Sequence, residues 1–401
     1  MPTRSYSPTS ATSNRRDIAF KGSGRTPFSR GGDGKAALGP VLREVLIGEA
    51  MHALSIPSTR VLAALTTGEE VFREQPLPGA ILTRVAASHL RVGTLQYFAA
   101  RKDIAMLGRV ADYAIARHDP ALADQPDRYL RFLAAVVERQ AALIARWMGV
   151  GFIHGVMNTD NMTLSGETID YGPCAFMEAY DPATVFSSID LEGRYAYGNQ
   201  PAIAQWNLAR LAEALLPLID TDPDRAVAQA TEVLQGFSQH YENHWLGVFR
   251  AKLGLGENGS IEHDRQLISD FLGLLEQNKL DFTLGFRTLL KLAQGNGDEL
   301  RAMFGLGTAS LNQWLQRWCE SLPSVAGADI GKMRKANPCY IARNYQVEAA
   351  LAAAVSENEL RPMERLLEVL RQPFDEREGY EAYARPARPE QSAGYQTFCG
   401  T

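Results

Sequence analysis

Asp160, Asn161 and Asp170 are three oxygen-bearing side chains that stand close together near the middle of this sequence. The residues between Asn161 and Asp170 read Met-Thr-Leu-Ser-Gly-Glu-Thr-Ile, which predicts a strand, a turn at Ser165 and Gly166, and a second short strand. Such a hairpin would bring Asn161 and Asp170 together at its open end. An amide oxygen and a carboxylate that converge in this way suit Mg²⁺, which takes most of its other ligands from substrate phosphates and water. The alternative is a polar hairpin whose Asp-Asn turn is simply solvated.

The loop that contains Asp160 has the spacing of a phosphate-transfer site. Protein kinases use a His-Arg-Asp loop, an Asn for one metal ion and an Asp-Phe-Gly for another. Here His154 precedes Asn161 by seven positions, and the Asp-Tyr-Gly that starts at Asp170 stands in the place of Asp-Phe-Gly. Val156 occupies the position of the kinase Asp, so Asp160 is the only carboxylate left in this loop to act as a base.

The N-terminal part of the chain carries candidate phosphate contacts. Asp17–Lys21 alternates like a strand and ends at a lysine, and the loop from Gly22 to Gly34 is rich in glycine. Such a loop can bring backbone N–H groups close to phosphates, although a plain surface loop has the same composition. A helix is predicted over Leu38–Leu54, and it carries Glu44 and Glu49. Either glutamate could pair with the lysine as in kinases, and the spacing does not choose between them.

Two arginines flank the start of the next helix. Ala80–Ala86 is predicted as a strand that contains Arg84. Ser88 is a good N-cap for a helix over His89–Ala100, which places Arg91 in the first turn, where the helix dipole disfavours a cation. The two arginines could grip a triphosphate in bidentate fashion. The alternative is two ordinary surface arginines.

Beyond about residue 100 the pattern is predominantly helical. Tyr129–Met148 reads as a long amphipathic helix that leads into the central loop, which is the stretch Phe152–Pro173. From Arg371 onward prolines and acids become more frequent, which predicts an irregular strap as far as Thr401. The other predicted elements are a strand at Val61–Leu65, a loop at Glu69–Pro78, and helices at Ala202–Leu218, Asp224–Glu242, Trp245–Leu253, Ile261–Asn278, Phe282–Gln294, Leu311–Glu320, Gln346–Val355 and Leu360–Leu370.

The composition narrows the class of protein. A chain of 401 residues with 45% apolar residues fits one two-lobed enzyme or two to three domains, and we expect a monomer. The net charge of −5 gives no electrostatic reason to expect nucleic acid, and no apolar run is long enough to span a membrane. Four scattered cysteines favour a reducing, cytoplasmic compartment. The Ser/Thr-rich start, with arginines and no acids, gives mitochondrial targeting as the alternative.

Several longer motifs point to one family. They are Lys-Gly-Ser-Gly-Arg-Thr-Pro-Phe-Ser-Arg from Lys21, Arg-Glu-Val-Leu-Ile-Gly-Glu-Ala-Met-His from Arg43, Leu-Thr-Arg-Val-Ala from Leu82, His-Gly-Val-Met-Asn-Thr-Asp-Asn-Met from His154, Ile-Asp-Tyr-Gly-Pro from Ile169, Gly-Arg-Tyr-Ala-Tyr-Gly-Asn-Gln-Pro from Gly193, Asn-Pro-Cys-Tyr-Ile-Ala-Arg-Asn-Tyr from Asn337 and Arg-Leu-Leu-Glu-Val-Leu-Arg-Gln-Pro-Phe-Asp from Arg365. Through these motifs the chain resembles the selenoprotein O family from about Asp17 to its C-terminus.

The resemblance implies an α+β, protein-kinase-like two-lobed fold with a truncated small N-lobe and a large, mostly helical C-lobe. It also implies transfer of AMP from ATP to Ser, Thr or Tyr hydroxyls of protein substrates, dependent on Mg²⁺ or alternatively Mn²⁺. Asp160 would be the base, and Asn161 and Asp170 would hold the metal ion. ATP would bind in an inverted sense, with its α-phosphate toward the acceptor. The implied nucleotide contacts are Lys21, Asp33, Gly34, Glu44, Arg84, Arg91 and Asp170, with Glu44 as the partner of Lys21.

The resemblance also predicts the boundaries of the domains and leaves alternative functions open. We expect a disordered start over 1–16, a partial N-lobe over 17–100, a helical C-lobe over 101–370 and a C-terminal strap over 371–401. Family members carry a further N-terminal segment of the Gln-Leu-Gly-Asp-Gly-Arg-Ala type, which the residues before Asp17 do not resemble. A catalytically silent, kinase-like binding module is therefore the alternative function, and an ordinary kinase is a third. Some members carry a redox-active residue near the C-terminus, so Cys399 could form a regulatory disulfide with Cys174.

Overall fold

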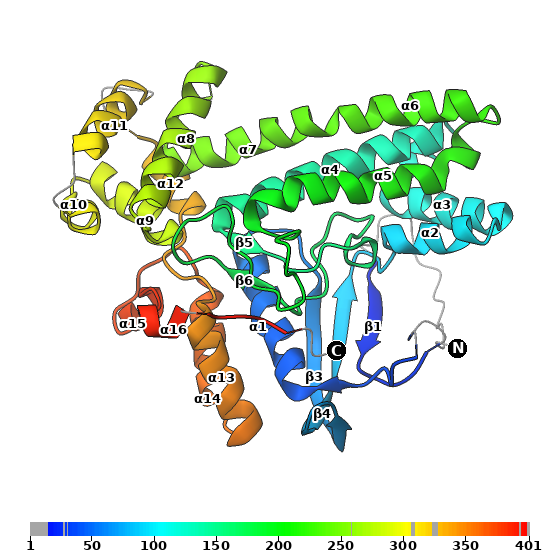
Figure 1. The fold of residues 1–401 in the computed structure, drawn as a ribbon, viewed down its shortest axis with the longest axis horizontal. Helices are drawn as coiled ribbons and strands as arrows, with labels where there is room; N and C mark the ends of the chain where they lie inside the picture. The colour runs from blue at the N-terminus through cyan, green and yellow to red at the C-terminus, as the bar shows by residue number, and fades with distance from the viewer. Residues whose placement is uncertain are drawn as a thin grey trace.

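The computed structural model describes residues 15–26, 29, 31–257, 259–305, 309–322, 328–392 and 394–398. An antiparallel sheet is built from the N-terminal part of the chain. Strand β4 (Pro76–Ala86) pairs with β3 (Arg60–Phe72) along one edge, and with β1 (Asp17–Lys21) and β2 (Ala36–Ala37) along the other. Strands β3 and β4 form a long hairpin, drawn in blue below the green helices in Figure 1.

The prediction of a loop over Glu69–Pro78 is wrong, because these residues form the far end of the β3–β4 hairpin. Glu70 pairs with Pro78 and Phe72 pairs with Pro76, so the turn is confined to 73–75. The two prolines are tolerated because this end of β4 is paired on one side only, which leaves no neighbour that needs their missing N–H groups.

The register of the sheet decides which side chains face inward. Lys21 lies opposite Leu82, and Ala19 lies opposite Arg84, so Lys21 and Arg84 share the face of Leu82. This face is covered by helix α1 (Leu38–Ala53), and both Leu82 and Arg84 are buried there. The prediction of a helix over Leu38–Leu54 is confirmed.

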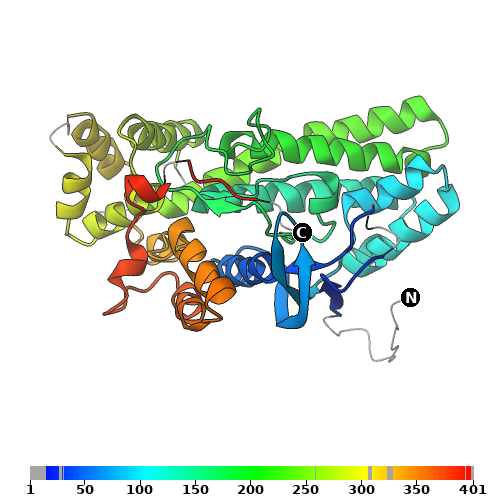
Figure 2. The ribbon, with the colours of Figure 1, turned by 60° about the horizontal axis from the view of Figure 1, so that its bottom comes forward.

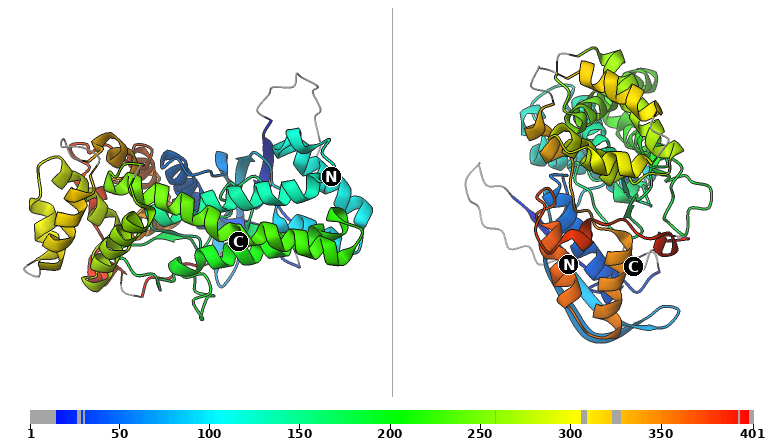
Figure 3. Two further views of the ribbon diagram at one scale, coloured as in Figure 1. Left: turned by 90° about the horizontal axis from the view of Figure 1, so that it is seen from above. Right: turned by 90° about the vertical axis from the view of Figure 1, so that its left-hand side faces the viewer.

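A layer of long helices lies on the other side of the central loop from the sheet. It contains α4 (Arg128–Val150), α5 (Gln200–Ile219), α6 (Pro223–Gln235) and α7 (Phe237–Leu253). Helices α6 and α7 follow one another end to end and lie alongside α4 and α5 in Figure 1, and the layer lies above the sheet in the right-hand view of Figure 3. Helix α4 buries apolar residues at helical spacing, as the prediction over Tyr129–Met148 requires.

The remaining helices complete a mixed α/β protein, which confirms the predicted α+β class in this general sense. Helices α13 (Asn344–Ser356) and α14 (Arg361–Leu370) return to the N-terminal part and pack against α1, as the orange and blue helices of Figure 2 show. No helix in the described ranges is long and apolar enough to cross a membrane. The other bounds are α3 Ile104–His118, α8 Ile261–Gln277, α9 Phe282–Ala293, α10 Asp298–Phe304, α11 Ala309–Glu320, α12 Ile330–Ala336, α15 Glu381–Ala384 and α16 Pro389–Ser392.

The C-terminal segment crosses the residues that follow the central loop. Thr397 donates from Oγ1 to the carbonyl of Pro173 at 2.7 Å, and its backbone N–H donates to the carbonyl of Phe186 at 2.7 Å. Two short helices, α15 and α16, interrupt the irregular course that we predict there. Of the start over 1–16, only residues 15 and 16 are described, and Cys399 also lies outside the described residues.

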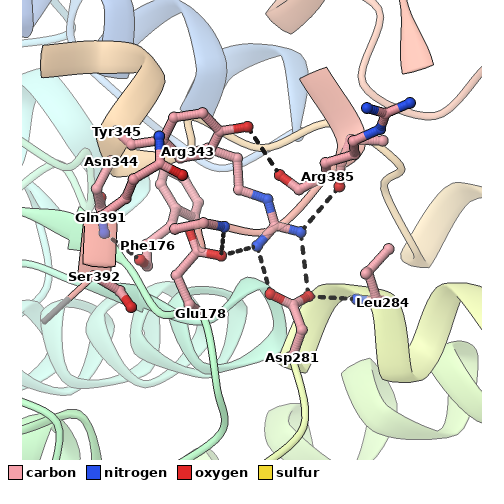
Figure 4. A network of polar contacts seen from close by, with 12 residues as sticks. Phe176, Glu178, Asp281, Leu284, Arg343, Asn344, Tyr345, Arg385, Gln391 and Ser392 are labelled. Carbon is pink, nitrogen blue, oxygen red and sulfur yellow. Dashed lines mark hydrogen bonds and ion pairs between the residues drawn. The ribbon is translucent and has the colours of Figure 1, made fainter. Parts of the chain in front are cut away.

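A buried arginine joins three distant segments close to this tail. The side chain of Arg343 is fully buried, and its Nη1 lies 2.6 Å from Glu178 Oε2 and 2.5 Å from Asp281 Oδ2. Nη2 donates to the carbonyl of Ala384, while Glu178 accepts from the backbone N–H of Ala387. Figure 4 shows the carboxylates of Glu178 and Asp281 meeting at the guanidinium of Arg343. Two carboxylates therefore share one cation at the place where the tail docks.

Candidate functional site

A cluster of charged side chains forms where the sheet, α1 and the central loop meet. Lys21, at the end of β1, places Nζ 3.0 Å from Glu44 Oε2 on α1. Arg84, on β4, donates from Nε to Glu44 Oε1 at 2.7 Å. Because Glu44 is only 2% exposed, its carboxylate is enclosed between these two cations. The other candidate, Glu49, instead binds Arg60 and Arg371, so the structure distinguishes two glutamates that the spacing left equivalent.

Asp170 brings the central loop into the same cluster. Its Oδ1 lies 3.1 Å from Lys21 Nζ and 2.6 Å from Arg84 Nη2, and its Oδ2 lies 3.2 Å from Arg91 Nη2. Three cations therefore surround two carboxylates, which leaves one positive charge in excess. Side-chain exposures of 21% for Lys21 and 28% for Arg91 leave both cations accessible from solvent, whereas Arg84 is buried.

The charge state of the cluster follows from competition between burial and neighbouring charges. Burial alone would raise the pKa of Asp170, but Arg84, Lys21 and Arg91 hold it well below its usual range. Burial alone would lower the pKa of Lys21, but Asp170 and Glu44 raise it above its usual value. Lys21 and Asp170 are therefore both charged near neutral pH, and the site is suited to an anion that can approach the accessible cations.

The backbone of Asp170 is held in an uncommon conformation. Its φ of 62° lies in the left-handed region, where residues other than glycine are infrequent. The neighbours fix it on both sides: the buried His154 ring donates from Nε2 to the carbonyl of Ile169 at 2.9 Å, and the Tyr171 hydroxyl is hydrogen bonded to Ser58. Burial lowers the pKa of His154, so this ring is neutral and acts as a positioning group.

The segment between Asn161 and Asp170 is not the self-paired hairpin that its sequence predicts. Thr163 forms a β-bridge with Arg91, and Thr168 forms one with Ser58. The arms of the segment thus pair with Arg91 and Ser58, which belong to the N-terminal part of the chain. The consequence is that the metal-site candidates are attached directly to the part of the chain that carries the cations.

Asp160 and Asn161 lie in a single 3₁₀ turn, Thr159–Asn161, which packs against the start of helix α2 (Val92–Ala100). The predicted helix start at Ser88 is wrong, because α2 begins three residues later than expected and Arg91 is its N-cap. The amide nitrogen of Asn161 donates to the carbonyl of Val156 at 2.9 Å, which leaves the amide oxygen as its remaining polar atom.

The donor set suits a hard cation only in part. Asn161 offers an amide oxygen and Asp170 a carboxylate, which are the ligands that Mg²⁺ prefers. In the part of the chain that the structure describes, no three acidic, histidine or cysteine side chains converge as a metal site. The protein would therefore supply two ligands here, and phosphates and water would supply the others.

Asp33 and Gly34 lie on the glycine-rich loop, outside the charged cluster. Asp33 pairs with Arg73 at 2.9 Å and accepts from the backbone N–H of Lys35. Gly34 has a φ of 68°, and a Cβ there would lie 2.2 Å from the carbonyl of Gly24, so the loop closes only with glycine at this position. The cluster thus brings together five of the site residues predicted from the sequence, namely Lys21, Glu44, Arg84, Arg91 and Asp170. Asp33 and Gly34 lie outside it, and Asp160 and Asn161 lie in the turn that packs against α2.

Two residues that shape the site were not identified from the sequence. Arg43, one residue before Glu44, is buried and donates to the carbonyls of Gly172 at 3.1 Å and Cys174 at 2.6 Å, which fixes the segment after Asp170. Gly93 lies against the carboxylate of Asp160. In the sequence, Arg43 is marked only by its position next to Glu44, and Gly93 only by being a glycine inside a predicted helix.

The comparisons with known proteins agree on one family. The family described as protein adenylyltransferase SelO matches residues 6–371. The chain is 59% identical to protein nucleotidyltransferase YdiU of Chromobacterium violaceum, over 98% of this chain and 82% of that protein. It is 60% identical to the YdiU protein of Cereibacter sphaeroides, over 98% and 80%, and 55% identical to that of Rhizobium etli, over 96% and 78%.

Proposed function

The chain belongs to the SelO family of protein adenylyltransferases, and we propose that it transfers AMP from ATP to Ser, Thr or Tyr hydroxyls of proteins. The observation that carries the proposal is the cluster of Lys21, Arg84 and Arg91 around Asp170 and Glu44. Its excess positive charge and its two accessible cations suit a polyphosphate.

The same cluster favours adenylyl transfer over phosphoryl transfer. A kinase presents its terminal phosphate to the acceptor, whereas an adenylyltransferase must stabilise a departing pyrophosphate inside the site. The three cations lie together at one place, so they would hold the β- and γ-phosphates as a unit and leave the α-phosphate toward the acceptor. This is the inverted binding mode that the resemblance to the family implies.

Asp160 is proposed as the general base. The acceptor hydroxyl would lose its proton to the carboxylate of Asp160 as its oxygen attacks the α-phosphorus. The new oxygen–phosphorus bond forms while the bond to the β-phosphate oxygen breaks, and pyrophosphate leaves on Lys21, Arg84 and Arg91. Asn161 holds the turn by its contact with Val156, which keeps Asp160 in place.

Asn161 and Asp170 would hold Mg²⁺, or alternatively Mn²⁺. The ion would neutralise phosphate oxygens as negative charge develops on the leaving group. In the structure both oxygens of Asp170 contact cations. An arriving triphosphate would draw those cations to itself, which would make the carboxylate available to a metal ion.

The proposal extends to the architecture. The antiparallel sheet with α1 would correspond to a small kinase-like N-lobe over 17–100, and the helical layer to a C-lobe over 101–370. The segment over 371–401 would be a strap, and its contacts with Pro173 and Phe186 support that role.

Label transfer tests the proposed reaction. The protein is incubated with MgCl₂, a mixture of candidate protein acceptors and ATP labelled either at the α- or at the γ-phosphate. Label from the α-phosphate alone, recovered in protein as AMP, is the expected result. Label from the γ-phosphate would indicate a kinase, and no label in either arm would indicate a silent binding module. Asp160→Asn, which keeps the size of the side chain, is the matched control and should abolish labelling.

A further inference from the structure

Gly93 is the second residue of α2, and its Cα lies directly against the side chain of Asp160. A Cβ built on Gly93 would lie 2.1 Å from Asp160 Oδ1 and 3.2 Å from Asp160 Cγ. Real Cβ atoms do not approach other heavy atoms this closely, so alanine cannot enter without movement. Gly93 is not among the glycines with a positive φ. Glycine is less favourable than alanine inside a helix, so the reason for it here is space and not backbone conformation.

The turn that carries Gly93 is fixed on both sides. The backbone N–H of Val92 donates to the carbonyl of Met162, in the central loop, at 3.0 Å. Arg91 holds Asp170 Oδ2, and the Thr94 hydroxyl accepts from the Arg91 N–H at 3.2 Å. The helix start cannot move away from the loop without breaking these contacts. A side chain at position 93 would therefore displace the carboxylate of Asp160.

This arrangement also sets the electrostatic surroundings of the carboxylate. The first turn of a helix carries a partial positive charge, which favours a carboxylate beside it. Because glycine has no side chain, Asp160 can approach this turn closely. Its carboxylate thus lies against the first turn of α2.

We infer that Gly93 is a positioning residue for the proposed base, and that its lack of a side chain fixes where Asp160 meets the acceptor hydroxyl. The inference rests on the proposed function, since it assigns Asp160 a role in proton transfer. It adds to the proposed site a residue on α2, whereas the base lies in the 3₁₀ turn of the central loop.

Gly93→Ala tests this directly. A displacement of about 1 Å is enough to lower the rate of a positioned reaction about 100-fold. We expect kcat for AMP transfer to fall by about this factor, while the Kd for ATP, measured by calorimetry, changes less than about threefold. Gly247→Ala on α7 is the matched control, because nothing lies within 4 Å of a Cβ there. This control should keep wild-type kcat.

A stability cycle separates this inference from the proposed function. Gly93→Ala should lower the melting temperature in the wild-type background. In the Asp160→Ala background, where the clashing carboxylate is absent and alanine is the better helix former, it should leave the melting temperature unchanged or raise it. This result is expected even if the protein transfers no AMP, in which case only the proposed function fails. Equal destabilisation in the two backgrounds, or a loss of ATP affinity as large as the loss of kcat, would overturn the inference.

Discussion

Replacing Glu178 with glutamine should change how the stability of the protein depends on pH. Glu178 and Asp281 both contact Nη1 of Arg343, at 2.6 and 2.5 Å, so one guanidinium serves two carboxylates. Burial, and to a smaller extent the nearby Asp281, raise the pKa of Glu178 from 4.5 to about 7, against the opposing effect of Arg343. The amide of glutamine resembles the protonated acid in shape and charge.

The sign and size of the effect follow from the pKa. A carboxyl group whose pKa is higher in the folded than in the unfolded state binds protons preferentially when folded. Its contribution to stability is fully present below pH 4.5 and is lost as the pH rises to about 7. The interval from 4.5 to 7, at about 1.4 kcal/mol per pH unit, gives a loss of about 3 kcal/mol above pH 7. Glu178→Gln should not undergo this loss.

Thermal unfolding between pH 5 and pH 8.5 is the appropriate assay. At pH 5 the melting temperatures of the variant and the wild type should nearly coincide, and at pH 8 the variant should melt higher by on the order of 5 °C. Because the variant and the wild type are compared at the same pH, the effects of other titrating groups on the two melting temperatures cancel. Glu376→Gln is the matched control, because Arg287 and Lys291 hold the pKa of Glu376 below its usual value in spite of burial. That variant should leave the pH profile between 5 and 8.5 unchanged in shape.

Parallel melting curves for Glu178→Gln and the wild type would refute the reasoning. They would mean that the contact with Arg343 keeps Glu178 ionised in the folded protein across the whole range. A lower melting temperature for Glu178→Gln at pH 8 would be a stronger contradiction. It would show that the negative charge of Glu178 stabilises the docked tail.

Other expected outcomes concern the site and the cysteines. Asp170→Ala should abolish AMP transfer from α-labelled ATP, and transfer at the wild-type rate would contradict its assignment as a metal ligand. Arg84→Ala and Arg91→Ala should each weaken ATP binding about 10- to 100-fold, the equivalent of losing a charge-assisted hydrogen bond, and leave adenosine binding unchanged. Calorimetry with both ligands measures this, and equal losses would assign the arginines to packing alone. Iodoacetamide should modify the exposed Cys319 much faster than Cys174, because burial raises the pKa of the Cys174 thiol to about 11. Peptide mass mapping follows the two rates, and similar rates would show that Cys174 is accessible.

The elements with a strong apolar period are the ones that the sequence predicts well. Helices α1 and α4 lie within two residues of their predicted bounds. Helix α4 buries apolar residues at helical spacing, and α1 is buried over most of its surface. The start of α2 was missed for a different reason. Ser88 is a sound N-cap by type, but its hydroxyl is hydrogen bonded to His118 Nε2, thirty positions away. Local capping rules fail when the side chain of the expected N-cap residue is hydrogen bonded to a residue that is distant in the sequence.

The same limitation applies to the central segment. The sequence around Ser165 and Gly166 favours a turn, and a turn is present, but its arms form bridges with Arg91 and Ser58. The predicted proximity of the site residues therefore depends on pairing with other parts of the chain, which local sequence does not specify. The contact of Lys21 with Asp170 joins residues 149 positions apart in the same way.

The five charges of the cluster explain why net charge is a poor guide to this protein. The whole chain carries −5, yet the site holds three cations and two carboxylates. Cations held at a partly buried phosphate site need compensation in the resting protein, because an unpaired buried charge is strongly destabilising. Glu44 is enclosed and can serve only as a permanent partner, whereas the side chain of Asp170 is 20% exposed and can exchange its partners. Loss of the charge at Glu44 should therefore affect folding first, and loss of the charge at Asp170 should affect the reaction first.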